Sequence, residues 1–308
     1  MRVTRQDVLD AARRIDGRVR RTPLLPPAQR DSVWMKCELL QHCGVFKTRG
    51  AFNRQLAGLE AGEIGGGGVV IASGGNAGLA QAFAARELGV RCTVFVPEAA
   101  PQVKVDRIRA YDAEVRPVGA EFAEAHLASV RFAEEHGAVL LHAYDQLEVA
   151  AGAGTIAEEI LEDEPGIDTI VVAVGGGGLY AGIAASALGR ARMVAVEPER
   201  CPTLHAALAA GEPVDVEVGG VAADSLGARR LGELAFAATR AEAPVSVLVT
   251  EDEILRARTR LWQDFRLPSE PGAATAYAAL TSGGYVPAEG EKVALVVCGA
   301  NTDLATLA

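Results

Sequence analysis

Short apolar runs alternate along most of the chain with longer stretches of helical spacing. The runs are rich in valine and isoleucine and have the length of single buried strands; they lie at 69–72, 92–96, 139–141, 169–174, 193–196, 245–249 and 293–297. Alanine-rich helical patterns lie between most of them, at 78–88, 101–111, 121–136 and 155–161. This alternation predicts βαβ units, and therefore an α/β fold of mostly parallel sheets with helices on both faces.

One uncharged stretch, at 169–189, has 21 residues and is long enough to span a bilayer. Six of its residues are glycines, four of them consecutive, and adjacent glycines make a helix costly. A strand, a glycine loop and a helix therefore explain the stretch better than a membrane span. The basic N-terminal segment, 1–24, lacks an apolar core, so it predicts an amphipathic helix rather than a signal peptide.

Two of the expected strand-to-helix loops are alike, and ligands of open α/β sheets bind at such loops, beyond the carboxyl ends of the strands. Backbone N–H groups and the helix dipole at the start of a helix together hold an anion. Four adjacent glycines admit a phosphate, whereas a loop with polar side chains suits a smaller anion such as a carboxylate; flexible turns are the alternative. The polar loop comprises Ser73, Gly74, Gly75, Asn76 and Ala77, and the glycine loop comprises Gly175, Gly176, Gly177 and Gly178.

The composition is that of a folded, acidic protein. The chain has 308 residues, which suits two domains or one large unit, and its net charge of −10 argues against nucleic acid or an anionic membrane surface as partner. The five cysteines are scattered without close pairs, which disfavours a disulfide framework or a zinc site and indicates a reducing, cytoplasmic location. These cysteines are Cys37, Cys43, Cys92, Cys201 and Cys298.

Lysine is scarce, since only four of the 30 basic residues are lysines. A deprotonated lysine amine can form an imine with a carbonyl compound, which an arginine cannot do. We expect Lys104 and Lys292 at the surface and Lys36 in a structural salt bridge. Lys47 follows Phe46 at the start of a helical segment and is the candidate for imine chemistry.

The glycine loop also matches a different motif. Gly176, Gly178 and Ala181 fit the pattern GxGxxA after a strand, and Glu197 lies 21 residues beyond Gly176. This is the dinucleotide-binding fingerprint with its ribose-binding acid, so a nicotinamide-dependent oxidoreductase is an alternative. The fingerprint leaves the polar loop at Ser73 unexplained.

Four motifs in a fixed order carry a resemblance to a known family. They are GVFKTRGA at 44–51, SGGNAG at 73–78, GGGG at 175–178 and CGAN at 298–301, with RTPL at 21–24 and EPGAA at 270–274 as further signatures. Together they resemble the serine/threonine dehydratases, which are fold-type II enzymes dependent on pyridoxal phosphate, and most closely the liver-type serine dehydratases. The resemblance spans essentially the whole chain.

The resemblance implies a tryptophan-synthase-β-like architecture. The large, cofactor-binding domain would comprise 1–40 and 143–308, and the smaller domain at 41–142 would be inserted in it and close over the substrate. Homodimerisation and the absence of a C-terminal regulatory domain are also implied.

Roles at the site follow from the same resemblance. Lys47 would carry the cofactor as a Schiff base and then move the substrate's α-proton. Phe46 would pack on the cofactor ring, Asn76 would bind its 3′-oxygen, and Cys298 would face its nitrogen. A neutral thiol there moderates the electron sink, which suits prompt elimination. The glycines would hold the phosphate (Gly175, Gly176, Gly177, Gly178), and the polar loop would hold the substrate carboxylate (Ser73, Gly74, Gly75, Asn76, Ala77).

The implied reaction is α,β-elimination of water from L-serine or L-threonine, which gives pyruvate or 2-ketobutyrate and ammonia. Ala77 stands where threonine dehydratases usually have histidine, and Gly74 stands where serine racemases have a serine that acts as second base. The missing hydroxyl disfavours racemisation. Racemisation, β-replacement and dehydration of another β-hydroxy amino acid nevertheless stay as alternatives.

A cation site is also implied. Glu197, Cys201 and Thr203 lie where relatives bind a cation. Thr203 replaces a second carboxylate, and this lower ligand charge favours a monovalent ion such as potassium. A solvated loop that carries Glu197 is the alternative.

Overall fold

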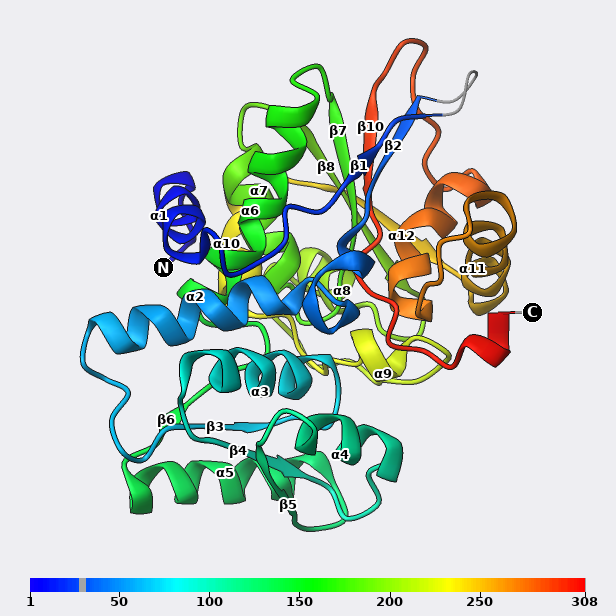
Figure 1. The fold of residues 1–308 in the computed structure, drawn as a ribbon. Coiled ribbons are helices and arrows are strands. Elements are labelled where there is room, and N and C mark those ends of the chain that lie inside the picture. Colours follow the sequence, from blue (N-terminus) through cyan, green and yellow to red (C-terminus); the bar gives the residue numbers. More distant parts are fainter. Residues whose placement is uncertain (28–31, 308) are drawn as a thin grey trace.

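The computed structural model describes residues 1–27 and 32–307 and contains two separate open sheets flanked by helices (Figure 1). The larger sheet has the strand order β1-β2-β10-β7-β8-β9, and the smaller has the order β5-β4-β3-β6. Every pair of neighbouring strands is parallel except β1 with β2. The expected α/β fold of two mostly parallel sheets is therefore confirmed.

The larger sheet draws its strands from both ends of the described chain. Its outer pair precedes the smaller sheet in sequence, and the other four strands follow it. The strands are β1 (Leu24–Leu25), β2 (Val33–Lys36), β7 (Thr169–Ala173), β8 (Arg192–Pro198), β9 (Val245–Val249) and β10 (Val293–Val296). Figure 1 shows α6 and α7 on one face of this sheet and α11 and α12 on the other.

The smaller sheet is covered on both faces, and successive residues of its strands face opposite ways. Val69 and Ile71 of β3 pack with α3 and α4, whereas Val70 and Ala72 pack with α5. Its strands are β3 (Val69–Ala72), β4 (Cys92–Val96), β5 (Glu114–Pro117) and β6 (Val139–Leu140). The sequence pattern missed β5 because this edge strand, EVRP, has exposed ends and no apolar run.

The helices occupy the segments between the strands. Those of the first half are α1 (Arg5–Ile15), α2 (Lys47–Glu60), α3 (Asn76–Leu88), α4 (Gln102–Arg109), α5 (Phe122–His136) and α6 (Leu147–Asp163). Those of the second half are α7 (Gly178–Ala187), α8 (Thr203–Ala210), α9 (Ala223–Leu226), α10 (Glu233–Ala241), α11 (Glu251–Phe265) and α12 (Pro271–Ser282). Short 3-10 turns lie at Glu38–Leu40, His42–Gly44 and Leu304–Leu307.

The uncharged stretch at 169–189 forms β7, the glycine loop and α7, as expected. In the described parts of the chain, no helix is both long and apolar enough to cross a membrane.

Helices α2 and α3 lie between the two sheets, and glycines bring α2, α6 and α7 into close backbone contact. Figure 1 shows α2 and α3 lying between the two sheets, and α2 packs on both α3 and α6. A Cβ on Gly50 of α2 would lie 2.5 Å from the carbonyl oxygen of Val149 in α6. A Cβ on Gly182 of α7 would lie 2.0 Å from the carbonyl oxygen of Ala150. These glycines let α2, α6 and α7 approach closely, so the start of α2 is rigidly placed.

We expect Gly182→Ala to lower the free energy of unfolding by about 1–3 kcal/mol, because the added methyl group forces α6 and α7 apart. Denaturant unfolding measures this change. Gly66→Ala is the matched control, since a Cβ at Gly66 has no neighbour within 4 Å in the described structure; we expect it to change stability by less than about 0.5 kcal/mol. Equal effects of the two substitutions would contradict the close packing.

Candidate active site

Lys47 is the first residue of α2 and is half-buried. Its amine donates a hydrogen bond to the carbonyl oxygen of Ala143 at 3.2 Å and lies 4.9 Å from the centre of the Phe46 ring. Burial lowers the pKa of Lys47, although the nearby Cys298 and Glu270 act in the opposite direction. A lowered pKa increases the fraction of neutral amine, which is the form that attacks a carbonyl carbon or accepts a proton.

The other three lysines are engaged in ion pairs. Lys36 is fully buried and pairs with Glu159 at 2.5 Å, which confirms the expected structural salt bridge. Lys104 pairs with Asp224, and Lys292 pairs with Glu164 at 3.1 Å. Lys47 is thus the lysine for which the described residues provide no carboxylate partner.

A buried charge cluster fixes the first turn of α2. Arg49 is fully buried and donates to both oxygens of Glu38, at 2.9 and 2.8 Å, and to both oxygens of Glu159, at 2.6 and 2.9 Å. With Lys36, the cluster contains two cations and two carboxylates. It connects α2 to β2, to the turn after β2 and to α6, and Lys47 lies two residues before its central arginine.

The polar loop follows β3 directly. Gly75 donates its N–H to Ser73 Oγ at 3.4 Å, and Ser73 donates its own N–H to the carbonyl of Phe95 at 3.1 Å. Ser73, Gly74, Gly75 and Asn76 are half-buried, and Ala77 is buried. No side chain of the described residues caps α3 at Gly75, so the N-terminus of the helix stays open to an anion.

The glycine loop forms a cradle between β7 and α7. The N–H groups of Gly175, Gly176 and Gly177 have no acceptor among the described residues, and Gly177 has a φ of 90°, which favours glycine. A Cβ on Gly176 would lie 2.4 Å from the ring of Tyr144. Side chains are therefore excluded from the loop, while its amide groups are free for an anion such as a phosphate.

A turn that the sequence analysis did not identify joins Lys47 to the glycine loop. Ala143 accepts from Lys47, and Tyr144, the next residue, covers the loop. Nδ1 of His142 accepts from the N–H of Asp145 at 2.9 Å, and the Asp145 carboxylate accepts from the first amides of α10 at 3.1 Å. In the sequence, this turn could have been predicted from its position directly after the carboxyl end of β6.

Cys298 lies beside the Lys47 segment. It follows β10, is 4% exposed, and accepts the N–H of Phe46 at its carbonyl oxygen at 3.0 Å. Burial strongly raises the pKa of its thiol, so the group stays neutral. The sequence suggested this residue, and the structure places it close to Lys47.

Asn76 adds a link that the sequence did not suggest. Its Nδ2 donates to Glu270 at 2.8 and 3.0 Å, and its Oδ1 accepts from Asn301 at 2.7 Å. Asn76, Glu270 and Asn301 are thereby joined, and Glu270 and Cys298 both lie close enough to Lys47 to affect its pKa.

These residues fit the cofactor that the sequence leads us to expect. An amine with a lowered pKa, a cradle of free amide groups and a neutral thiol match the aldehyde, the phosphate and the ring nitrogen of pyridoxal phosphate. The polar loop offers a second anion site for a substrate carboxylate.

Glu197 lies outside this arrangement and is fully buried. It accepts from Thr203 Oγ1 at 3.0 Å and from the N–H groups of Leu204 and His205 at 2.7 and 2.8 Å, so it caps α8. The solvated-loop alternative is therefore wrong. The dinucleotide alternative fits poorly as well, because the carboxylate that would bind a ribose is occupied. Burial raises the pKa of Glu197 to about 7, although the hydrogen bonds oppose this.

The expected cation ligands are otherwise engaged in protein contacts. The Thr203 hydroxyl has one proton, which is shared between Glu197 and the carbonyl of Gly175, 2.5 Å from Oγ1. Cys201 Sγ donates to the carbonyl of Gly219 at 3.2 Å. Across 1–27 and 32–307, no cluster of three or more histidine, cysteine, aspartate or glutamate side chains is arranged to hold a metal. Cation binding at Glu197, Cys201 and Thr203 stays a prediction.

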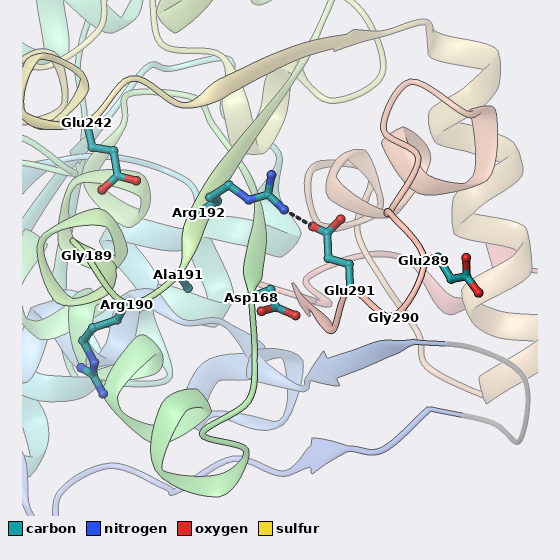
Figure 2. A pocket seen from close by; sticks show the side chains of 9 residues that line it. All are labelled: Asp168, Gly189, Arg190, Ala191, Arg192, Glu242, Glu289, Gly290 and Glu291. Atoms are coloured by element: carbon teal, nitrogen blue, oxygen red, sulfur yellow. Dashed lines mark ion pairs between the residues drawn. The ribbon is translucent and has the colours of Figure 1, made fainter.

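A charged hollow lies at the opposite ends of the strands (Figure 2). Asp168 precedes β7, Arg192 begins β8 and Glu291 precedes β10, so the hollow is at the amino ends of these strands. Arg192 pairs with Glu291 at 3.1 Å, and Arg190 pairs with Glu158 at 2.9 Å. Because ligands of open parallel sheets bind at the carboxyl ends, we assign the active site to the two loops and not to this hollow.

Known proteins resemble the chain over nearly its whole length. A family model described as pyridoxal-phosphate dependent enzyme matches residues 15–299. The chain is 37% identical to an L-threonine ammonia-lyase of Geobacter sulfurreducens, over 97% of this chain and 76% of that protein. It is 34% identical to a serine racemase of Dictyostelium discoideum, over 99% of this chain and 97% of that protein. Among solved structures, maize serine racemase has a TM-score of 0.92 at 31% identity, and the match covers 100% of this chain and 96% of the maize chain.

We expect Arg49→Met to lower the free energy of unfolding by about 3–5 kcal/mol, because it leaves Glu38 and Glu159 as buried carboxylates without their main partner. Denaturant unfolding measures the loss. Arg13→Met is the control, since Arg13 pairs with Asp10 on the exposed side of α1; its effect should stay within about 1 kcal/mol. A similarly small loss for Arg49→Met would show that the cluster does not hold the first turn of α2.

Glu197→Gln should change how stability depends on pH. The raised pKa means that the folded protein keeps a proton which the unfolded chain releases between about 4.5 and 7. Glu197 therefore stabilises the fold less as the pH rises through this range. We expect the stability of the variant relative to the parent to increase from pH 5 to 7, by at most about 1.4 kcal/mol per pH unit. A difference between Glu197→Gln and the parent that does not change with pH would contradict the burial effect.

Proposed function

The chain belongs to the family of pyridoxal-phosphate dependent enzymes, and from this premise we propose that it is a lyase that eliminates water from L-serine, L-threonine or both. The products would be pyruvate or 2-ketobutyrate, with ammonia. The observation that carries the proposal is Lys47, a half-buried lysine without a carboxylate partner among the described residues. The turn at 142–145 joins its amine to the glycine loop. The 37% identity to an L-threonine ammonia-lyase supports the reaction type.

Different residues would contact different parts of the cofactor. Gly175, Gly176, Gly177 and Gly178 would bind its phosphate through their N–H groups. Lys47 would hold its aldehyde carbon, and Phe46 would pack on its ring. Asn76 would donate to the ring oxygen, and the neutral thiol of Cys298 would face the ring nitrogen. When bound, pyridoxal phosphate supplies an electron-withdrawing ring that stabilises negative charge at the substrate α-carbon.

Lys47 then acts on protons. With the substrate bound, the free amine of Lys47 would remove the substrate's α-proton, and its lowered pKa favours the neutral form that can accept a proton. Ser73, Gly75 and their neighbouring N–H groups hold the substrate carboxylate, which fixes the α-proton in front of Lys47. The β-hydroxyl leaves with a proton as water. The released aminoacrylate takes up water and gives the 2-keto acid and ammonia, so no net water is consumed.

The polar loop favours elimination over racemisation. A racemase needs a second base on the face of the α-carbon opposite to Lys47. Gly74 has no side chain for that role. A Cβ added at Gly74 would lie 3.4 Å from Val96 and 3.9 Å from Ala100, so its neighbours are apolar. The similarity to serine racemases keeps racemisation as the second candidate. β-Replacement and the dehydration of another β-hydroxy amino acid are further alternatives on the same site.

The remaining predictions concern organisation. We infer a large domain of 1–40 and 143–308 and a small domain of 41–142 that closes over the substrate. The ion pair between Lys104 of α4 and Asp224 of α9 joins residues of the two proposed domains. A homodimer and a bound monovalent cation such as potassium stay predictions from the family resemblance, and a cytoplasmic location stays a prediction from the scattered cysteines.

The proposal is tested by keto-acid release from protein loaded with pyridoxal phosphate. The parent should release pyruvate from L-serine or 2-ketobutyrate from L-threonine, and neither from the D-enantiomers. Lys47→Ala should lower the rate by roughly 10³-fold or more, because it removes both the attachment point and the base. Lys292→Ala, at the opposite end of the sheet, should retain the parent's rate.

Two results would overturn the proposal. Full activity of Lys47→Ala would refute the role of Lys47. Conversion of L-serine to D-serine by the parent without keto acid would favour the racemase alternative.

A further inference from the structure

Glu270 is a buried carboxylate at the edge of the proposed site, and it is 4% exposed. It directly precedes α12, and its N–H donates to the carbonyl of Gly299 at 3.1 Å, which holds it beside Cys298. A Cβ on Gly299 would lie 2.6 Å from Oε1 of Glu270, so the side chain is closely packed from that direction. The carboxylate therefore has a fixed position.

The Asn76 amide has one hydrogen-bonding orientation in this environment. In its ionised form, which the hydrogen bond from Asn76 and the charge of Lys47 favour, Glu270 only accepts hydrogen bonds and therefore takes the NH₂ group of Asn76 as its partner. Nδ2 lies 2.8 and 3.0 Å from the two oxygens of Glu270. The amide oxygen in turn accepts from Nδ2 of Asn301 at 2.7 Å. Both neighbours thus require the same orientation. The two oxygens belong to one carboxylate, so a single N–H of Asn76 can serve both, and the second N–H can then serve another acceptor.

Burial and the neighbouring charges act in opposite directions on the ionisation of Glu270. Burial raises its pKa to about 7 and Asp224 adds to the effect, while the hydrogen bond from Asn76 and the charge of Lys47 act against it. Cys298, on the adjoining segment, is held neutral. Glu270 is thus the carboxylate that connects Asn76, on the small-sheet side of the site, with Lys47 and Cys298.

We propose that Glu270 is a positioning residue of this site, which acts through Asn76 by holding its amide as an N–H donor toward the cofactor's ring oxygen. The inference rests on the proposed function. If Glu270 is replaced by glutamine, the new amide can present either a donor or an acceptor to Asn76. The Asn76 side chain is then free to turn over and present its oxygen to the ring oxygen, which is repulsive.

The test is the affinity for pyridoxal phosphate, measured by absorbance titration, with the circular dichroism band of the bound cofactor as the second readout. We expect Glu270→Gln to weaken binding roughly tenfold, to alter the band and to lower kcat more than KM changes. In an Asn76→Ala background the same substitution should have no further effect, because Glu270 acts only through Asn76. Asn301→Ala, which removes the other constraint on the amide, should weaken binding in the same direction.

Glu291→Gln is the matched control. Glu291 is also buried and accepts from Thr169 and Tyr285, but it lies at the opposite end of the sheet. It should lower the melting temperature and leave the affinity and the circular dichroism band of the bound cofactor as in the parent. If Glu270→Gln lowers the melting temperature but leaves the cofactor affinity and the circular dichroism band unchanged, the role of Glu270 is structural and the inference is overturned.

Three further outcomes are decisive. Additive losses in the Asn76→Ala background would also contradict action through Asn76. If Glu270→Gln does not fold, Asn301→Ala decides, and parent-like binding by that variant overturns the inference. Failure of the parent itself to bind pyridoxal phosphate would instead refute the proposed function.

Discussion

The buried contact of Arg49 with two carboxylates is the interaction on which the rest of the site depends. Charges are costly to bury, and here the cost is offset because each oxygen of Glu38 and Glu159 accepts from a guanidinium N–H. The cluster fixes the first turn of α2 against β2 and α6. Lys47 starts that turn, so a charge balance in the core determines where the reactive amine lies.

From this fixed point the site is assembled by backbone geometry more than by side chains. The turn at 142–145 provides both the carbonyl that accepts from Lys47 and the ring of Tyr144 that covers the glycine loop. Amide groups at two helix starts, α3 and α7, would form the two proposed anion sites. Two separate anion sites suit a reaction in which the cofactor phosphate stays bound while substrates bind and products dissociate.

Much of this arrangement could be predicted from the sequence, because buried parallel strands and strand-to-helix glycine loops leave strong local patterns. The two loops were predicted in this way, whereas the scarcity of lysine singled out Lys47 as the candidate amine; the predicted salt bridge of Lys36 is present. The edge strand β5 was missed, since it has no apolar run. The contact of Glu270 with Asn76 joins residues 194 positions apart, and only the folded chain brings them together. Glu197 does not lie in a solvated loop: it is fully buried and caps the start of α8.

The central claim is that Lys47 holds the cofactor, and the most direct measurement is to trap that attachment. Protein loaded with pyridoxal phosphate is reduced with borohydride, which converts a carbon–nitrogen double bond into a stable amine, and the digested peptides are identified by mass spectrometry. The account predicts a pyridoxyl label on the peptide that contains Lys47. A label on Lys36, Lys104 or Lys292, or no label on any lysine, would contradict it.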